Sequence, residues 1–289
     1  MTEQQGFHAG ELAVQRRAGV QEDAERLAGM LEAADLRGGI GRFLAEQTFL
    51  VLTARDRAGR LWTTALSGDP GFLRVRGTTE LQVHAVPRAG DPLADLAPGQ
   101  PVGVLVLDAA HRRRARINGT LTAVRDGVLT VEAEQAYGNC PRFIHPRDLE
   151  PTAAPATAVR TGTALAPADG DLIARADTFL LGTVHPTRGA DASHRGGPAG
   201  LVRVTDETTL WWPDFPGNNM FNSLGNLAVD PEAALLFLDF ATGETLHLSG
   251  RAELEWTTGS DVDGGTGRRV RFTVEAVVAG PSVALREAA

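Results

Sequence analysis

Neutral hydrogen-bond donors gather in the stretch PDFPGNNMFNSLGN, residues 213–226. They are Asn218, Asn219, Asn222 and Ser223, with a fourth asparagine, Asn226, at the end of the stretch and apolar residues between them. If those apolar residues mark a helical turn that begins near Asn218, its free N–H groups form an anion site. The alternative is an asparagine N-cap with nothing bound, which explains one asparagine more easily than four.

A second polar stretch, SHRGGPAG, begins with Ser193, His194 and Arg195, followed by Gly196 and Gly197. Two glycines allow a flat ligand to approach the backbone closely. An arginine can bind a phosphate or a ring carbonyl through two parallel hydrogen bonds. The alternative is a glycine-rich β-bulge with a solvated arginine, and these residues alone leave both interpretations open.

Signatures of other chemistries are missing or weak. The sequence lacks the phosphate-binding P-loop, the zinc-protease helix, paired cysteines and the nucleophile elbow. The DASH run at residues 191–194 is too compact for a catalytic triad. HRRRAR at residues 111–116 would place Arg112, Arg114 and Arg116 on one strand face. Because the net charge is −8, we interpret this face as solvated or salt-bridged and expect no nucleic-acid binding.

The single cysteine, Cys140, lies in the run AYGNCPRFI. It excludes an intrachain disulfide, and His145 is a candidate to activate it as a nucleophile. A structural cysteine is the favoured interpretation, and its role stays open. No apolar stretch approaches ~20 residues, so we expect no membrane span. Residues 1–10 do not resemble a secretory signal, and the sequence therefore predicts a cytoplasmic protein.

The elements that must position these residues are mainly strands. Helical spacing of apolar residues across residues 20–36 predicts one amphipathic helix, and a second short helix is expected from near Ile40 to Gln47. From Thr48 onward, short apolar and β-branched runs alternate with Gly, Pro and Asp. This spacing predicts an antiparallel barrel or sandwich.

The second half of the chain repeats the first. Residues 46–81 match residues 175–210, each copy with Thr-Phe-Leu in its first strand, and residues 100–121 match residues 231–252. The copies diverge after their Thr-Thr turns, where the asparagine-rich stretch lies. The duplication predicts two similar β domains, and the divergent segment is where a specific site is expected.

Five motifs occur in a fixed order: FHAGELAVQRRAGV (7–20), WTTALSGDPGFL (62–73), AYGNCPRFI (136–144), SHRGGPAGLVRV (193–204) and PDFPGNNMFNSLGNL (213–227). Together they resemble the predicted flavin-nucleotide-binding proteins related to pyridoxamine 5′-phosphate oxidase, over nearly the whole chain. The resemblance implies a mainly β protein of two tandem FMN-binding split β-barrels of Greek-key type with small helices. It also implies that the flavin lies at an interface between two barrels.

On this basis we expect four regions. They are an N-terminal helical extension at residues 1–42, a first barrel repeat at 43–149, a linker at 150–170, and a second barrel repeat at 171–289 that carries the flavin site.

The resemblance also implies which residues bind the cofactor. SHRGG would run along the ring, and the asparagine-rich loop would hold the ribityl chain and phosphate. The predicted cofactor-binding residues are Ser193, His194, Arg195, Gly196, Gly197, Trp212, Pro213, Asp214, Asn218, Asn219, Asn222 and Ser223. We expect one site per chain, since the first repeat lacks the asparagine-rich loop. We expect no metal and identify no catalytic residue, with His194 only a candidate proton donor.

Two departures weigh against oxidation of vitamin B6. The loop reads Gly-Asn-Asn-Met where the oxidase has a Ser-Arg-Lys type phosphate clamp, and the tail differs from the oxidase's substrate-binding segment. The sequence therefore predicts an FMN-dependent oxidoreductase of unknown small-molecule substrate, with NAD(P)H as a candidate donor and a homodimer as the assembly. The alternatives are a flavin carrier or sensor without turnover, a catalytically dead scaffold, and a split barrel that binds deazaflavin or haem.

Overall fold

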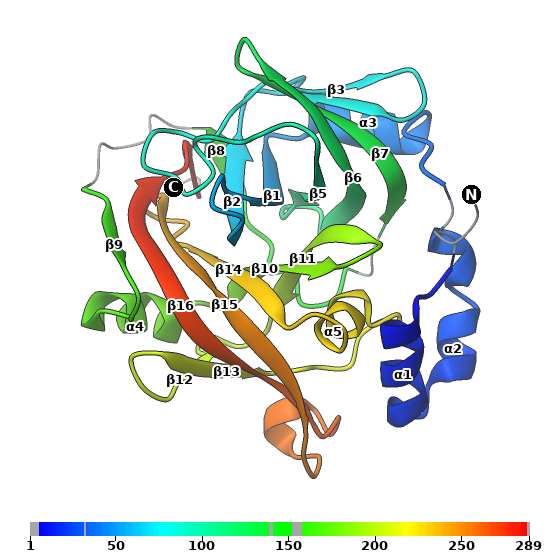
Figure 1. Ribbon diagram of the computed structural model, residues 1–289, viewed down its shortest axis with the longest axis vertical. Helices are drawn as coiled ribbons and strands as arrows, with labels where there is room; N and C mark the ends of the chain where they lie inside the picture. The colour runs from blue at the N-terminus through cyan, green and yellow to red at the C-terminus, as the bar shows by residue number, and fades with distance from the viewer. Residues whose placement is uncertain (1–5, 32, 139–140, 152–157, 288–289) are drawn as a thin grey trace.

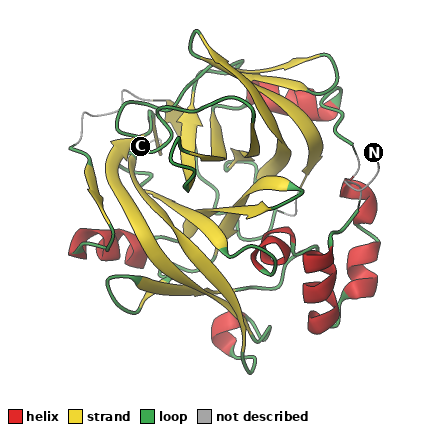
Figure 2. Ribbon diagram, viewed as in Figure 1, coloured by secondary structure: helices red, strands yellow, loops and turns green. Residues whose placement is uncertain are grey.

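The computed structural model describes residues 6–31, 33–138, 141–151 and 158–287. Strands dominate these residues, and short helices lie around them (Figure 2). Two large antiparallel sheets make up most of the molecule, one in the upper and one in the lower part of Figure 1. The predicted mainly β fold is confirmed.

The first sheet has the strand order β2-β1-β5-β6-β7-β4-β3. Its strands are β1 (Phe49–Arg55), β2 (Leu61–Ser67), β3 (Leu73–Arg76), β4 (Glu80–Val83), β5 (Gln100–Asp108), β6 (Arg113–Arg125) and β7 (Val128–Gly138).

The second sheet has the order β11-β10-β14-β15-β16-β13-β12, so each strand takes the place of its counterpart in the first. A further strand, β9, pairs with β16, and β8 pairs with β17 apart from both sheets. The bounds are β8 (Leu149–Pro151), β9 (Arg160–Gly162), β10 (Thr178–His185), β11 (Gly189–Gly196), β12 (Arg203–Val204), β13 (Thr209–Pro213), β14 (Glu232–Leu238), β15 (Glu244–Trp256), β16 (Arg268–Ser282) and β17 (Leu285–Glu287).

Each sheet encloses its own apolar core, and matching the cores aligns the two halves. Three residues paired across β1, β5 and β6 lie in the first core: Leu52, Val104 and Ile117. The residues paired in the same way in the second core are Leu181, Leu235 and Leu248. The Thr-Phe-Leu match from sequence is therefore one residue out of register, because Phe49 faces the other half whereas Phe179 faces inward.

The helices are short. They are α1 (Ala9–Ala18), α2 (Gln21–Glu25), the 3-10 turn η1 (Ala28–Leu31), α3 (Gly39–Glu46), α4 (Pro167–Arg175), α5 (Asn222–Leu227) and the 3-10 turn η2 (Asp261–Asp263). No helix in the described part of the chain has the length and apolar character needed to cross a membrane.

The single helix predicted over residues 20–36 is wrong. An α1 helix that the periodicity missed ends at Gly19, whose left-handed φ of 70° stops it. The following segment forms only α2 and η1, because Ala33 bridges to Gln135 of β7 and Leu31 packs with Tyr137. The second predicted helix is confirmed as α3.

The two halves pack directly against each other through a shared apolar cluster of residues from β1, β5, β10 and β14. Two glycines allow the backbones to approach. A Cβ on Gly103 would lie 2.6 Å from the backbone of Asp191, and one on Gly182 would lie 2.3 Å from Thr63 Oγ1. At these two positions the halves approach too closely for a side chain. The limits proposed above for the four regions stay a prediction, although α4 and β9 show that 150–170 is partly regular structure.

Candidate functional site

A pocket with a cavity of about 110 Å³ opens at the seam between the two halves. Its first-half lining comes from β6 and from the loop after β7, and its second-half lining comes from β11, the end of β13 and the start of α5. The lining residues are Arg114, Arg116, Arg142, Phe143, His194, Arg195, Gly196, Leu201, Trp212, Pro213, Asp214, Phe215, Gly217, Asn218, Asn219, Phe221, Asn222, Ser223 and Leu224.

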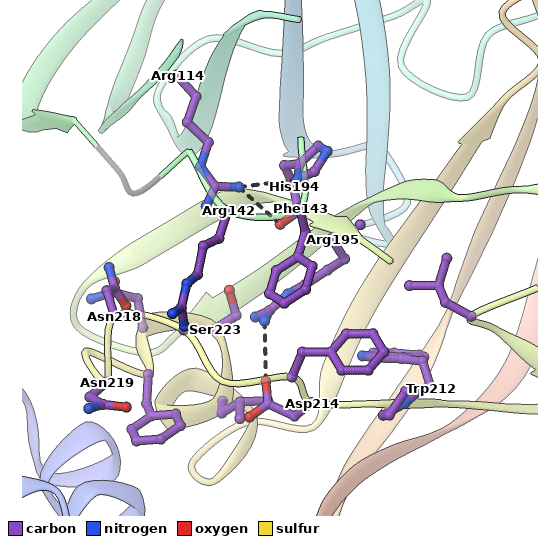
Figure 3. A pocket seen from close by; sticks show the side chains of 18 of the residues that line it. Arg114, Arg142, Phe143, His194, Arg195, Trp212, Asp214, Asn218, Asn219 and Ser223 are labelled. Atoms are coloured by element: carbon purple, nitrogen blue, oxygen red, sulfur yellow. Dashed lines mark hydrogen bonds and ion pairs between the residues drawn. The ribbon is translucent and has the colours of Figure 1, made fainter. Parts of the chain in front are cut away.

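Strand alternation brings two cations from β6 to this pocket, because Arg114 and Arg116 point to the same side. Arg114 Nη1 lies 3.1 Å from Nδ1 of His194 and 3.4 Å from its carbonyl oxygen (Figure 3). Burial and the nearby charges of Arg114 and Arg195 hold the pKa of His194 well below its usual range. His194 is therefore neutral at physiological pH, so it is not available there as an imidazolium proton donor.

Arg116 forms a buried ion pair with Asp191 of β11. Its Nη1 donates to both carboxylate oxygens at 3.1 Å. Asp191 also accepts from Ser223 Oγ at 3.2 Å and from Asn118 Nδ2 at 3.4 Å. Burial opposes the charged form of Arg116, but Asp191 and a hydrogen bond to Tyr137 outweigh it and raise the Arg116 pKa. Arg116 therefore stays charged, and its hydrogen bonds to Asp191 connect the pocket to the interior.

A second ion-pair cluster lies at the end of β13. Arg195 Nη1 donates to Asp214 Oδ1 at 3.4 Å (Figure 3), and Arg268 Nε donates to Oδ2 of the same carboxylate at 2.8 Å. Burial lowers the pKa of Arg195, and Asp214 works against that shift. One carboxylate thus serves two guanidinium groups, which leaves this side of the pocket positive.

The mouth of the pocket is framed by aromatic rings from both halves. Phe143 stacks on Phe215 with ring centroids 5.3 Å apart, and Arg142 Nη1 donates to the Pro216 carbonyl at 3.2 Å. Both contacts join the loop after β7 to the loop after β13. An apolar rim of this kind beside arginines suits a ligand with a flat ring and an anionic end.

The asparagine-rich loop differs from the predicted helical turn. Helix α5 begins at Asn222, and Asn219 and Phe221 before it have left-handed φ of 63° and 59°. Asn218 Oδ1 instead accepts from Met220 N at 3.2 Å in an Asx turn. Asn222 Nδ2 donates to Glu11 Oε1 at 2.6 Å. The amides therefore shape the loop and bind α1 as well as facing the pocket.

The pocket gathers the predicted cofactor-binding residues except Ser193 and Gly197. Ser193 lies behind the wall, where its Oγ is 3.0 Å from Ser223 Oγ. Packing within the protein leaves no room for a side chain at either glycine. A Cβ on Gly196 would lie 2.0 Å from the Phe143 carbonyl oxygen, and one on Gly197 would lie 2.7 Å from the Phe215 ring. Close packing of the loops therefore explains both glycines without a ligand.

Sequence reasoning missed the first-half wall of the pocket. It predicted a solvated or salt-bridged face for Arg114 and Arg116, and the Arg116 ion pair is present but buried. Arg112 does not share that face, because it precedes β6 in a turn with φ of 55°. The signal that could have found this wall is the pair of arginines two residues apart on one predicted strand. Cys140 lies outside the described residues, and His145 Nε2 is 2.8 Å from the Gly197 carbonyl oxygen.

A comparison with known families places this site in context. Residues 165–285, which contain β10 to β16 and the second-half wall of the pocket, match the family model for pyridoxamine 5′-phosphate oxidase. This part of the chain is related to the pyridoxamine 5′-phosphate oxidase family. None of the curated proteins matches the chain significantly.

Three solved structures with similar folds each match less than half of this chain. A putative pyridoxamine 5′-phosphate oxidase from Lactobacillus delbrueckii has 15% identity and a TM-score of 0.33, over 40% of this chain and 94% of its own. A FAD-binding protein from Mesorhizobium loti has 12% identity and a TM-score of 0.30, over 43% and 99%. HutZ, the haem storage protein from Vibrio cholerae, has 13% identity and a TM-score of 0.29, over 40% and 95%.

In the described ranges of the chain, no cluster of three or more His, Cys, Asp or Glu side chains is arranged to hold a metal ion. The chemistry that the pocket itself offers is cationic and aromatic, through arginines, neutral amides and phenylalanine rings.

Proposed function

We propose that this protein binds FMN in the pocket between its two halves and acts as an FMN-dependent oxidoreductase on an unknown small molecule. Relatedness to the pyridoxamine 5′-phosphate oxidase family supports a flavin nucleotide as the class of ligand. The observation that carries the choice of pocket is its cationic lining, with Arg114, Arg116, Arg142 and Arg195 around one opening.

Two buried nitrogens support an anionic ligand. Among the described residues, Nε of Arg116 and Nε of Arg195 are buried without a hydrogen-bond partner. Buried donors of this kind are costly unless a partner satisfies them. A phosphate accepts from arginine more strongly than a neutral group does. The residues present therefore fit the phosphate of a flavin nucleotide, with the arginines as its ligands.

The ring would lie toward the mouth. A cavity of about 110 Å³ is smaller than the ~300–1,000 Å³ of typical ligand pockets, so it encloses only part of an FMN molecule. Phe143 and Phe215 at the opening provide apolar faces for the ring, and Trp212 provides part of the wall. Bound FMN would supply the electron-transfer chemistry, and the protein would bind it, orient it and shield one side from water.

The pocket walls come from both halves of one chain, which supports one complete site per chain. A homodimer with NAD(P)H as donor remains part of the proposal, and the pocket does not need a second copy to complete its described lining. True pyridoxamine phosphate oxidation is not proposed, because the loop lacks the oxidase's Ser-Arg-Lys clamp.

The visible absorbance spectrum tests this function. The purified protein, before and after FMN is added and then removed by desalting, should retain bands at roughly 370 and 450 nm. The paired Asn219→Ala and Ser223→Ala variant should retain less FMN. Its circular dichroism spectrum at the temperature of the binding assay checks that the chain is still folded, because Ser223 also donates to the buried Asp191 carboxylate. A protein that is colourless in both samples would contradict the proposal.

Turnover separates an enzyme from a carrier or sensor. An FMN-loaded sample should consume NADH or NADPH in steady state with an added electron acceptor. Retained flavin with no consumption of either donor would favour the carrier or sensor.

A further inference from the structure

A small polar cavity of about 30 Å³ lies behind the pocket, and the N-terminal FHAGE motif forms one side of it. Figure 1 shows α1 beside α5, and this contact brings Glu11 to the cavity. Asn222 lines both the cavity and the pocket. The cavity therefore lies directly against the proposed ligand site.

Glu11 is a buried carboxyl group with only 3% of its surface exposed. Oε1 accepts from Asn222 Nδ2 at 2.6 Å and Oε2 accepts from His8 N at 2.8 Å. Burial raises the pKa of Glu11 to about 7, the hydrogen bonds from His8 and Asn222 oppose this shift, and the charge of Asp191 adds to it. Glu11 is thus close to half protonated near neutral pH.

A polar route leads from this cavity to the pocket. Asp191 lines the cavity, and its carboxylate accepts from Arg116 and from the Ser223 hydroxyl, both of which line the pocket. Among the described residues, the buried Oδ1 of Asn118, also at the cavity, has no hydrogen-bond partner. A polar cavity of this size holds about one water molecule, which would satisfy that oxygen.

We propose that Glu11 is the proton-holding residue of the ligand pocket and takes up a proton from solvent when an anionic ligand binds. The proposal rests on the proposed function for the identity of the ligand. An anion in the pocket adds negative charge on the far side of Asn222 and Asp191, and like charges favour the neutral form of a nearby carboxyl group. The proton neutralises the Glu11 carboxylate.

The two histidines and the tyrosine near Glu11 have pKa values that are shifted away from neutrality. Burial lowers the pKa of His8 to about 4, lowers that of His185 and raises that of Tyr137. The charged groups nearby are Asp191 on β11, Arg116 on β6 and Arg188 in the turn between β10 and β11. Among these shifted groups, Glu11 is the one whose pKa is moved toward neutral pH.

Isothermal titration with FMN at pH 7, in two buffers of different ionisation enthalpy, measures the protons taken up on binding. The wild-type protein should take up as much as about half a proton more than Glu11→Gln, because a half-protonated group can gain no more than that. Glutamine keeps the oxygen that accepts from Asn222. Glu22→Gln, at an exposed position on α2, is the matched control and should behave as wild type.

The outcomes separate this inference from the proposed function. FMN binding with equal proton uptake in wild type and Glu11→Gln overturns the inference and leaves the function standing. If FMN does not bind, the same titration with inorganic phosphate decides. Proton uptake that depends on Glu11 then supports the inference, while the proposed FMN binding fails. A pocket that binds neither FMN nor phosphate overturns both proposals.

Discussion

The pocket has a counterpart at the equivalent place on the opposite side of the seam, and the two differ sharply in charge. The counterpart has a cavity of about 60 Å³ and is lined by Thr64, Ala65, Leu66, Ser67, Ala85, Val86, Arg88, Asp91, Thr245, Val283 and Ala284. When the two halves are aligned by their matched core residues, Arg114 corresponds to Thr245 and Arg116 corresponds to His247. His194–Gly196 corresponds to Ala65–Ser67.

The counterpart lacks arginines at the matched strand positions. His247 is buried, its Nδ1 lies 2.9 Å from the Thr63 carbonyl oxygen, and burial lowers its pKa, so it carries no charge at neutral pH. Within the described residues, Arg88 is the one arginine that lines this pocket, and it is exposed beside Asp91. The same strand positions thus build a cationic pocket on one side and a near-neutral one on the other. The two halves therefore share one scaffold, and the difference in charge comes from different residues at a few matched positions.

The largest effect should come from breaking the buried ion pair. Arg116→Met should destabilise the fold by about 3–5 kcal/mol, because it leaves the buried Asp191 carboxylate without its partner. Its counterpart His247→Leu loses only neutral hydrogen bonds and should cost about 1–3 kcal/mol. Denaturant unfolding measures both. Adding Asp191→Asn to Arg116→Met should recover part of the loss, and equal costs at the two positions would contradict the contrast.

The free energy of unfolding should depend on pH through Glu11, which lies beside the cationic pocket. Glu11 binds its proton more tightly in the folded than in the unfolded chain, since its pKa rises from 4.5 to about 7. Its stabilising contribution is therefore complete below pH ~4.5 and is lost as the pH rises to ~7, by about 3 kcal/mol.

Unfolding free energies of wild type and Glu11→Gln, measured from pH 4.5 to 8, isolate this term. As the pH rises, the unfolding free energy of the variant should increase relative to that of the wild type. Parallel curves across that range would show that Glu11 titrates as an ordinary surface acid.

Ligand affinity should depend on the arginine that faces His194. Arg114→Gln should weaken FMN binding by about ten- to a hundredfold, because hydrogen bonds to charged groups are worth about 1.5–3 kcal/mol. Thr245→Val at the counterpart position should leave the affinity unchanged. Fluorescence titration of FMN measures both, and an equal loss in the two variants would place the ligand elsewhere.

The smallest effect is expected at the mouth. Phe143→Ala should lower FMN affinity by about two- to tenfold, since aromatic contacts add ~0.5–1.5 kcal/mol beyond their buried area. Val283→Ala in the counterpart pocket should have no effect on binding. An increase in affinity with Phe143→Ala would mean that the Phe143 and Phe215 pair blocks the ring instead of contacting it.

Much of the fold follows from local pattern. The strand runs after Thr48 and the repeat between the halves are visible in the sequence because side-chain alternation and turn residues are local signals. Helix α1 is less visible, since its buried face against α5 includes the polar residues Glu11 and Gln15, which apolar periodicity does not register.

The site was only half visible for the same reason. Arg195 and the asparagine-rich loop stand out by composition, whereas Arg114 and Arg116 resemble any polar strand face until the opposite half is placed against them. Contacts across the seam join residues some 75 to 80 apart in the chain, as in Arg116 with Asp191 and Arg114 with His194. Spacing along one strand cannot reveal them.

The number of FMN molecules bound per chain tests the central claim most directly. Wild-type protein titrated to saturation with FMN, desalted and quantified at roughly 450 nm, should hold about one flavin per chain, in the cationic pocket alone. Two per chain would contradict the asymmetry between the pockets, and none would contradict the flavin site itself.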